Sequence, residues 1–213
     1  MTAAGATQQQ PYHHGNLRSA LVQAAVELAR EGGPPAIVLR EAARRIGVSP
    51  TAAYRHFAAL PQLVAAVAHF ALGELARSME AELAGCRPGG NPQQDAWDSL
   101  RAVGRGYVHF ALEEPGLFAV AFRREKRSVD PEPGTGASGL SPRDLLERAL
   151  DGMLTAGALA PEDRTAAATT AWAAVHGLSL LLLGPMGGVP SVEREAEIEA
   201  ALDLIGRGLI VRD

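Results

Sequence analysis

The sequence predicts an all-α fold, in which a small three-helix module is followed by a larger helical domain. Apolar residues recur at the three- and four-residue spacing of helices, and alanine and leucine dominate among them. Runs in which β-branched residues alternate with polar ones, as in strands, are scarce. Clusters of glycine and proline divide the chain into segments of helix length. These three observations together favour helices and disfavour sheets.

The chain begins with small and polar residues, and we expect residues 1–12 to form a disordered arm. The first helix is expected from Asn16 to Gly32, because glycines and prolines follow it directly. Three residues mark its apolar face: Leu21, Ala25 and Leu28. A module of residues 13–60 is therefore expected to begin with this helix.

The most informative stretch runs from Ile37 to Phe57, and its local signals predict a helix-turn-helix. Four residues share one face of a short first helix: Leu39, Ala42, Ala43 and Ile46. Gly47 then suits the left-handed position that ends a helix. Ser49 is a good N-cap, and Pro50 suits the first helical position, where a missing N–H costs nothing. The second helix is expected to carry Ala53, Tyr54 and Phe57.

Six further segments complete the chain, and we assign residues 61–213 to a C-terminal helical domain. The expected helices are Pro61–Ala84, Gln93–Leu112, Leu117–Lys126, Pro142–Thr155, Pro161–Leu183 and Val192–Val211. The segment from Ser128 to Ser141 is rich in glycine, proline and serine, which predicts a mobile loop.

The run GVSPTAAYRHF, with the preceding LREAARRI and first helix, resembles the N-terminal domain of the TetR/AcrR family of transcriptional regulators. The family pattern is a glycine–valine–serine turn, a tyrosine, one further residue, a histidine or tyrosine, and a phenylalanine. Six residues match it: Gly47, Val48, Ser49, Tyr54, His56 and Phe57. The opening YHHGNLR, Tyr12 to Arg18, resembles one subset of the family. Trp172, His176 and Gly177 are similar to the tryptophan–histidine–glycine signature of some family C-terminal domains.

The resemblance implies a homodimeric regulator that a small-molecule effector releases from a palindromic double-stranded DNA operator, and it favours repression over activation. It implies no cofactor. The distribution of charge along the chain is typical of a protein with one DNA-facing end. The first 60 residues hold six arginines and three glutamates, a net charge of +3. Because the whole chain has a net charge of −4, the remaining residues carry −7. Two positions depart from the family pattern. Leu60 occupies the position at which the family usually has a lysine that binds a phosphate of DNA. Val38 lies near the position at which the family usually has a serine or threonine that caps the first helix of the motif.

The candidate DNA contacts lie on and around the expected second helix of the motif. In this interpretation Thr51 and Ala52 face base edges, while Tyr54 and His56 reach phosphate oxygens, as the resemblance implies. The full candidate set is Arg40, Arg44, Arg45, Ser49, Pro50, Thr51, Ala52, Tyr54, Arg55 and His56. The structural alternative has Tyr54 packed between the helices and Arg55 merely solvated. Arg44 and Arg45 are either phosphate clamps or a solvated face.

The C-terminal domain is expected to hold a pocket for a small, mainly apolar effector. Large or polar residues on otherwise apolar helices form the candidate lining: Trp97, Tyr107, His109, Phe110, Phe118, Phe122, Met153, Trp172 and His176. Only His109 and His176 are expected to orient a ligand, because Arg101, Glu113 and Arg148 are expected to face solvent. Ordinary core packing without a cavity is the alternative.

Residues 165–192 contain no Asp, Glu, Lys or Arg, and their length alone permits a membrane span. We favour a subunit interface, because a histidine, threonines and a glycine–proline cluster lower the hydropathy of this segment. The expected interface residues on the last two helices are Leu180, Leu181, Leu182, Leu183, Ile198, Leu202, Ile205 and Leu209. We therefore expect no membrane partner.

Other function classes find little support in the sequence. We expect no enzyme and no metal site, because the chain has no His-x-x-x-His pair, paired cysteines, phosphate-cradling glycine loop or nucleophile elbow. The single Cys86 and the lack of a secretory segment favour the cytoplasm. Two rival interpretations stay open. One is a helical ligand-binding or scaffolding protein whose DNA-binding domain is weakened, as Leu60 in place of the usual lysine would indicate. The other is an architectural DNA binder without sequence preference.

Overall fold

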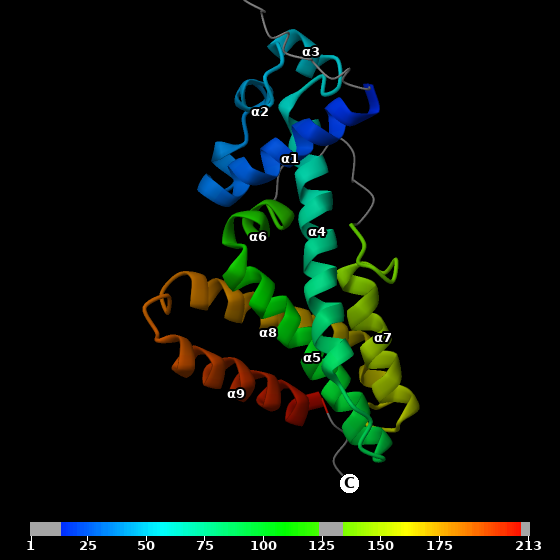
Figure 1. Cartoon of the computed structure of the whole chain (residues 1–213). Helices are drawn as coiled ribbons and strands as arrows, with labels where there is room; N and C mark the ends of the chain where they lie inside the picture. Colours follow the sequence, from blue (N-terminus) through cyan, green and yellow to red (C-terminus); the bar gives the residue numbers. More distant parts are fainter. Residues whose placement is uncertain (1–13, 124–133, 210–213) are drawn as a thin grey trace, which may run out of the picture.

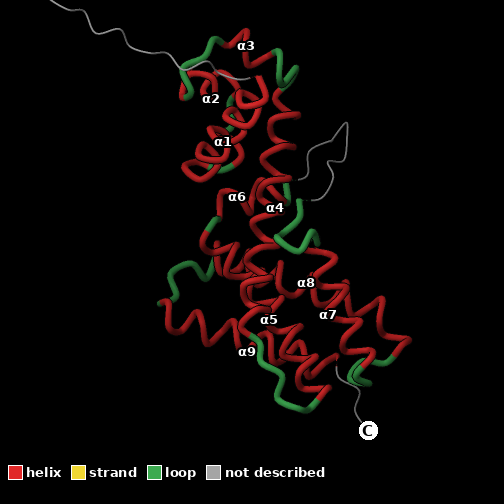
Figure 2. Tube along the Cα trace, turned by 45° about the vertical axis from the view of Figure 1, so that its right-hand side comes forward, coloured by secondary structure: helices red, strands yellow, loops and turns green. Residues whose placement is uncertain are grey.

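The structure is a computed structural model that describes residues 14–123 and 134–209. Within these ranges it has nine α-helices, two short 3-10 turns and no strand, so the all-α prediction is confirmed (Figures 1 and 2). The α-helices are α1 (His14–Gly32), α2 (Leu39–Arg45), α3 (Pro50–Tyr54), α4 (Leu60–Gly85), α5 (Pro92–Glu113), α6 (Pro115–Ala121), α7 (Pro142–Thr155), α8 (Arg164–Leu183) and α9 (Ser191–Leu209). The 3-10 turns are Pro34–Ala36 and Pro161–Asp163.

The first three helices form a compact cluster, which we call the head (Figure 1). Helix α1 packs against α2 and α4, and α2 packs against α3. The apolar faces predicted from helical spacing meet in its core, where these side chains are buried: Leu21, Ala25, Leu28, Leu39, Ala42, Ala43, Ala53 and Phe57. Small alanines in α2 and α3 let these short helices approach closely. The head therefore derives its shape from its own sequence pattern.

Helix α4 runs from the head into the rest of the molecule, like a shaft (Figure 1). It has 26 residues, which corresponds to a length of about 39 Å. One stripe along it is buried from end to end: Leu63, Val67, Ala71, Leu75 and Met79. Its first part packs on α1, and its later part packs on α5, α6 and α7. A single helix thus connects the head to the rest of the molecule.

The remaining helices, α5 to α9, form the body. Helix α5 lies at its centre, in contact with α4, α7, α8 and α9. Glycine permits the closest of these contacts, because a Cβ on Gly106 would lie 2.6 Å from the Cα of Met79 on α4. The Ser78 hydroxyl of α4 donates a hydrogen bond of 2.9 Å to the carbonyl oxygen of Gly106. Within the body, α6 lies nearest the head and contacts both α1 and α5 (Figures 1 and 2).

Three expectations differ from the structure. Helix α3 ends at Tyr54, so Phe57 follows this helix but still reaches the core of the head. Helix α6 begins at Pro115 and ends at Ala121, earlier than expected, and residue 126 lies outside the described residues. Residues 128–133 of the predicted mobile loop also lie outside them. The described part is anchored, because the Glu80 carboxylate accepts N–H hydrogen bonds of 2.7 and 3.0 Å from Ala137 and Ser138.

Candidate functional site

The turn between α2 and α3 has the geometry that its sequence predicts. Gly47 adopts a φ of 73°, the left-handed region that favours glycine. The N–H of Val48 then donates to the carbonyl oxygen of Ala43 at 3.0 Å, which closes the end of α2. Ser49 caps α3, since its hydroxyl oxygen accepts a 3.2 Å hydrogen bond from the N–H of Ala52. The two helices of the motif are therefore held by local backbone chemistry.

The candidate DNA contacts form one accessible surface around α3. Eight of the ten are exposed: Arg40, Arg44, Arg45, Ser49, Pro50, Thr51, Tyr54 and Arg55. Ala52 and His56 are half-buried. Tyr54 is 45% exposed, so the alternative in which it packs between the helices is wrong. The outer side of α3 thus exposes to solvent the side chains of Thr51, Tyr54 and Arg55.

Arg44 and Arg45 are both held by carboxylates of the head. Arg44 forks onto Glu41, with nitrogen–oxygen distances of 2.8 and 2.7 Å. Arg45 makes a two-pronged ion pair with Glu31 at 2.7 and 2.5 Å, and a longer contact of 3.4 Å with Glu41. Hydrogen bonding by the Arg44 guanidinium, helped by Arg45, lowers the pKa of Glu41 to about 2. The positive charge of these two side chains is thus largely compensated within the head.

The two residues that depart from the family pattern both lie where a helix begins. Val38 is the N-cap of α2, and no side-chain hydrogen bond caps that helix. Leu60 is the first residue of α4 and is 42% exposed. Both are apolar side chains at helix N-termini, where a hydrogen-bonding group would stabilise free N–H groups. The head therefore carries apolar surface at places where polar or basic side chains would strengthen contact with phosphate.

The body encloses a cavity of about 270 Å³ between α4 and α9. Its walls are mostly apolar, and its lining comprises Leu72, Met79, Trp97, Leu100, Arg101, Val103, Gly104, Tyr107, Ala121, Phe122, Ser141, Pro142, Arg143, Leu146, Ala171, Trp172, Val175, Leu202 and Ile205. The lining comes from α4, α5, α6, α7, α8 and α9. An apolar hollow with few polar groups is typical of sites for small organic ligands.

Four of the nine predicted lining residues do line this cavity: Trp97, Tyr107, Phe122 and Trp172. Four others were placed wrongly. Phe110, Phe118 and Met153 are buried in the core and do not line it. His109 is tied into ion pairs that link α4 to α9, since its two ring nitrogens lie 3.2 Å from Glu82 and 3.1 Å from Glu195.

His176, the ninth predicted residue, lies behind the cavity wall and binds one of its lining residues. The Tyr107 hydroxyl lies 2.8 Å from Nδ1 of His176. Either group can supply the proton of this hydrogen bond, because a neutral imidazole carries its proton on one of its two nitrogens and a phenol can donate or accept. Burial raises the pKa of Tyr107 and lowers the pKa of His176, so both groups are neutral at pH 7.

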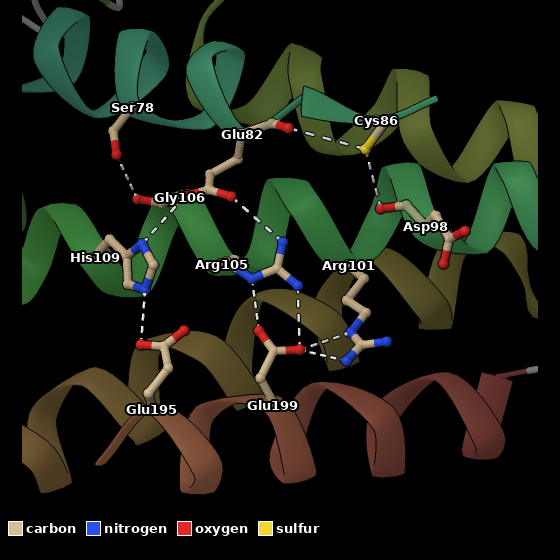
Figure 3. A network of polar contacts seen from close by, with 10 residues as sticks. All are labelled: Ser78, Glu82, Cys86, Asp98, Arg101, Arg105, Gly106, His109, Glu195 and Glu199. Carbon is tan, nitrogen blue, oxygen red and sulfur yellow. Dashed lines mark hydrogen bonds and ion pairs between the residues drawn. The ribbon is translucent and has the colours of Figure 1, made fainter. Parts of the chain in front are cut away.

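Arginines at the cavity were missed by the sequence analysis. Arg101 and Arg143 line it, although Arg101 was expected to face solvent. Arg101 pairs with Glu199 of α9, and its Nη1 lies 3.1 Å from Asp203. Next to it, Arg105 links α9 to α4 through Glu199 at 2.5 Å and Glu82 at 3.3 Å (Figure 3). Pairs between helices far apart in sequence hold these side chains, and helical spacing alone carries no signal for them.

The predicted subunit interface is only partly available at the surface. Leu182, Ile198 and Leu202 are at most 3% exposed within the subunit, so their placement in an interface was wrong. Ile205 is half-buried, and its place in an interface stays a prediction. The Leu209 side chain lies outside the described residues. Several apolar residues of α8 and α9 do remain exposed: Trp172, Leu180, Leu181, Leu183, Val192 and Leu204. We call these six residues the α8–α9 apolar surface.

Helix α8, with its preceding turn, is the one segment among the described residues that is long and apolar enough to cross a membrane. Its mean hydropathy is 1.5 over an 18-residue window, of which 28% is buried within the subunit. Length and composition alone are weak evidence for a span, because core and interface helices of soluble proteins pass the same test. The low buried fraction shows that much of this helix is not covered by its own subunit.

Two family models match two successive parts of the chain. Residues 21–67 match the model of bacterial regulatory proteins of the tetR family, and residues 100–205 match that of the tetracyclin repressor-like C-terminal domain. No curated protein matches the chain. A solved structure of a protein with unknown function from Rhodococcus sp. RHA1 is 28% identical, with a TM-score of 0.76, and covers 95% of this chain and 100% of that one.

Two further structures share the fold at lower identity. A TetR family transcription regulator from Marinobacter aquaeolei VT8 is 19% identical, with a TM-score of 0.59 and coverage of 92% and 96%. A TetR variant from Acinetobacter baumannii AYE, solved in complex with minocycline, is 18% identical, with a TM-score of 0.55 and coverage of 93% and 96%. Two family models thus match successive parts of the chain, and its helix-turn-helix head and helical body agree with both. The chain belongs to the TetR family of transcriptional regulators.

Proposed function

We propose that the chain is a homodimeric repressor that releases a roughly palindromic operator when a small, mainly apolar molecule fills the cavity. The proposal divides the chain into a DNA-binding domain, residues 13–60, and a regulatory and dimerisation domain, residues 61–213, with the cytoplasm as its location. One observation carries it: two helices that line the cavity, α4 and α6, also pack against the head. Occupancy of the cavity therefore has a physical route to the DNA-facing surface.

Helix α6 provides the shorter route. At its C-terminal end, Ala121 and Phe122 line the cavity. At its N-terminal end, Gly116 packs against the backbone of α1, and Glu114 pairs with Arg30 of α1 at 2.8 Å. Only seven residues separate these two ends. A ligand that displaces Phe122 would thus shift the support on which α1 rests.

Helix α4 provides the second route. Leu72 and Met79 line the cavity, while Leu63 and Val67 are buried nearer to the head. A change in the tilt of this rigid helix would move its N-terminal end, and the head with it. Two heads of a dimer bind adjacent major grooves only when their separation matches the helical repeat of DNA. Release requires that the ligand binds the released conformation more tightly than the DNA-bound one.

On DNA, α3 would enter the major groove with its exposed side. Thr51 and Ala52 would face base edges, where their methyl groups recognise thymine. Tyr54, Arg55 and His56, with Ser49 and Arg40, would contact the phosphates and fix the position of the helix. Arg44 and Arg45 are weaker candidates, because carboxylates of the head already compensate their charges. Most of these contacts are to phosphates, so binding is expected to weaken steeply with salt.

The α8–α9 apolar surface supports the homodimer. An apolar patch on the surface of one subunit is covered economically by the same patch on a second copy, related by a two-fold axis. The same covering explains, without a membrane, why residues 165–183 of α8 carry no charge although many of them are exposed. A two-fold dimer in turn requires two inverted half-sites in its operator.

The decisive experiment is selection of duplexes from a random pool by the purified protein, followed by affinity measurements at several salt concentrations. We expect selected duplexes to bind at least a hundredfold more tightly than random ones and to contain inverted repeats. Thr51→Ala should change the preference at one base pair, Tyr54→Phe should weaken all duplexes alike, and the distant Thr165→Ala should change neither. Equal affinity for selected and random duplexes would overturn the proposal.

A second candidate is a ligand-binding or scaffolding protein with a weakened head. It is favoured by Leu60 and Val38, which leave two helix N-termini of the head without a polar side chain, and by the internal pairing of Arg45. This candidate predicts ligand binding in the body without any selected duplex. The same selection therefore separates the two.

A further inference from the structure

Both charged residues of the cavity lining are cations. Among its 19 lining residues, Arg101 and Arg143 carry charge, and no carboxylate contributes to the wall. The other residues are apolar, apart from Ser141, Tyr107 and the indoles of two tryptophans. A cationic ligand group would therefore find no carboxylate in the cavity wall itself and would meet the Arg143 guanidinium at the rim, which is unfavourable in a partly desolvated cavity.

Arg101 has little capacity left for a ligand. Its Nε and Nη2 both bind Glu199, and its Nη1 lies 3.1 Å from Asp203. Both carboxylates belong to α9, which packs on α5 at this point. These contacts use the guanidinium on both of its edges, although Glu199 is shared with Arg105. Arg101 thus holds α9 in place and offers little attraction to an anion.

Arg143 is in the opposite situation. It lies in the first turn of α7, with its side chain 73% exposed at the rim of the cavity. Its ion pair with Glu147 is long, at 3.4 Å. A guanidinium has five N–H donors, so most of them stay available. The neighbouring Ser141 does not compete for a ligand, because its hydroxyl donates to Asp144 at 2.6 Å.

Arg143 can also turn toward a ligand without leaving a carboxylate unpaired. Its partner Glu147 has a second and closer partner, Arg164, at 2.8 Å. If Arg143 moves away, Glu147 keeps that ion pair. The N-terminal end of α7 adds little positive charge at this rim, because the Asp144 carboxylate caps it. Rim charge, free donors and a low cost of rearrangement thus coincide at one residue.

From this arrangement we propose that the ligand is an amphipathic monoanion. Its apolar chain fills the cavity against Trp97, Leu100 and Val103, and its carboxylate remains at the rim, where Arg143 binds it. This inference rests on the ligand-binding role proposed for the cavity and adds the chemical class of the ligand. Arg143 is the residue that distinguishes an acid from a neutral molecule of the same shape.

The test compares three probes of equal chain length: decanoate, 1-decanol and decylammonium. Calorimetric titration into the full-length protein at low salt, below the critical micelle concentrations, gives each Kd and stoichiometry. We expect one decanoate per subunit, bound about fivefold more tightly than decanol, which is the upper range for an exposed ion pair. Decylammonium should bind most weakly. Added salt should reduce the advantage of decanoate and leave decanol unaffected.

Variants assign the effect to Arg143. Arg143→Gln should weaken decanoate about fivefold and leave decanol unchanged. Arg148→Gln is the matched control, because Arg148 lies on the same helix, is exposed and does not line the cavity. Equal binding of decanoate and decanol, or an unchanged decanoate Kd in Arg143→Gln, would overturn the anion while leaving the cavity a ligand site. If no probe binds, the ligand role of the cavity falls as well, whereas DNA selection is unaffected.

Discussion

Gly116 of α6 lies so close to Ala29 of α1 that a Cβ on residue 116 would come within 2.0 Å of the Ala29 carbonyl oxygen. This contact closes the boundary between body and head without room for a methyl group. Beside it, Arg30 bridges Glu114 at the start of α6 and Glu27 on its own helix. The contact between α6 and α1 therefore combines close backbone packing, which an added side-chain atom would disturb, with an ion pair, which salt would weaken.

We predict that Gly116→Ala destabilises the protein and alters the coupling between ligand and DNA. The new methyl group must push α6 away from α1, and overpacking of this kind typically costs about 1–3 kcal/mol. Denaturant unfolding measures the loss, and DNA binding with and without decanoate measures the coupling. We expect a smaller effect of ligand on DNA affinity, because the displaced α6 no longer supports α1.

The control for this prediction is Gly152→Ala on α7. A Cβ there meets nothing within 4 Å, and the residue is exposed in the last turn of the helix. Alanine should stabilise such a position by about 0.5–1 kcal/mol, because it restricts the unfolded chain more than glycine does. A Gly116→Ala variant as stable as wild type would mean that the head and body do not meet in this way.

We predict that Leu60→Lys strengthens binding to all duplexes about equally. Leu60 is exposed at the start of α4, next to the surface proposed to contact DNA. A lysine there adds one phosphate contact and no base contact, so the salt slope should steepen by about one unit. Fluorescence anisotropy at several salt concentrations measures both quantities.

The matched control, Ala81→Lys, adds the same charge at an exposed position near the far end of the same helix. It should leave the salt slope unchanged, because screening removes the attraction over such a distance. If Leu60→Lys behaves like Ala81→Lys at low salt, residue 60 does not face the DNA backbone.

The head was largely predictable from sequence because short-range chemistry determines it. The left-handed Gly47, the Ser49 cap and Pro50 at the start of α3 each act within a few residues, and each takes its expected place. The limits of the helices followed from glycines and prolines for the same reason. Phe57 is the exception in the head: it was expected on α3, but the helix ends at Tyr54 and Phe57 is buried beyond it.

The cavity and the interface depended on which face of each helix turns inward, and that was harder to predict. Ile198, Leu202 and Ile205 form a regular stripe, but a stripe does not tell whether its own subunit or a partner covers it. Here Leu202 packs where Gly104 leaves room on α5. His109 was misplaced for a similar reason, since its partners Glu82 and Glu195 come from distant helices (Figure 3).

We predict that the double variant Leu181→Glu, Leu204→Glu is monomeric. Both leucines belong to the α8–α9 apolar surface and are 49% and 66% exposed in the subunit. The charges should change the stability of a single subunit little, but they cost several kcal/mol per site when buried unpaired in an interface. Light scattering gives the mass, and circular dichroism checks that the fold is intact.

The control adds the same two charges elsewhere, at the exposed Ala81 and Thr155. It should retain the mass of the wild type. A normal dimer in the double variant would place the interface away from α8 and α9. Leu202→Glu is unsuitable for this purpose, because Leu202 is 3% exposed and its substitution would disrupt the subunit itself.

Finally, we predict that His176 makes the protein less stable as the pH falls. Burial lowers the pKa of His176 below its ordinary 6.5, so near that pH the unfolded chain binds a proton that the folded chain does not. The unfolding free energy therefore decreases as pH falls through about 6.5, until the lowered folded pKa is passed. Urea unfolding at pH 7.5 and 5.5 should show a smaller decrease for His176→Gln, which retains a hydrogen-bond partner for the Tyr107 hydroxyl. Tyr107→Phe keeps the imidazole buried and should retain the wild-type decrease. Equal decreases in wild type and His176→Gln would mean that the folded protein protonates His176 as readily as the unfolded chain does.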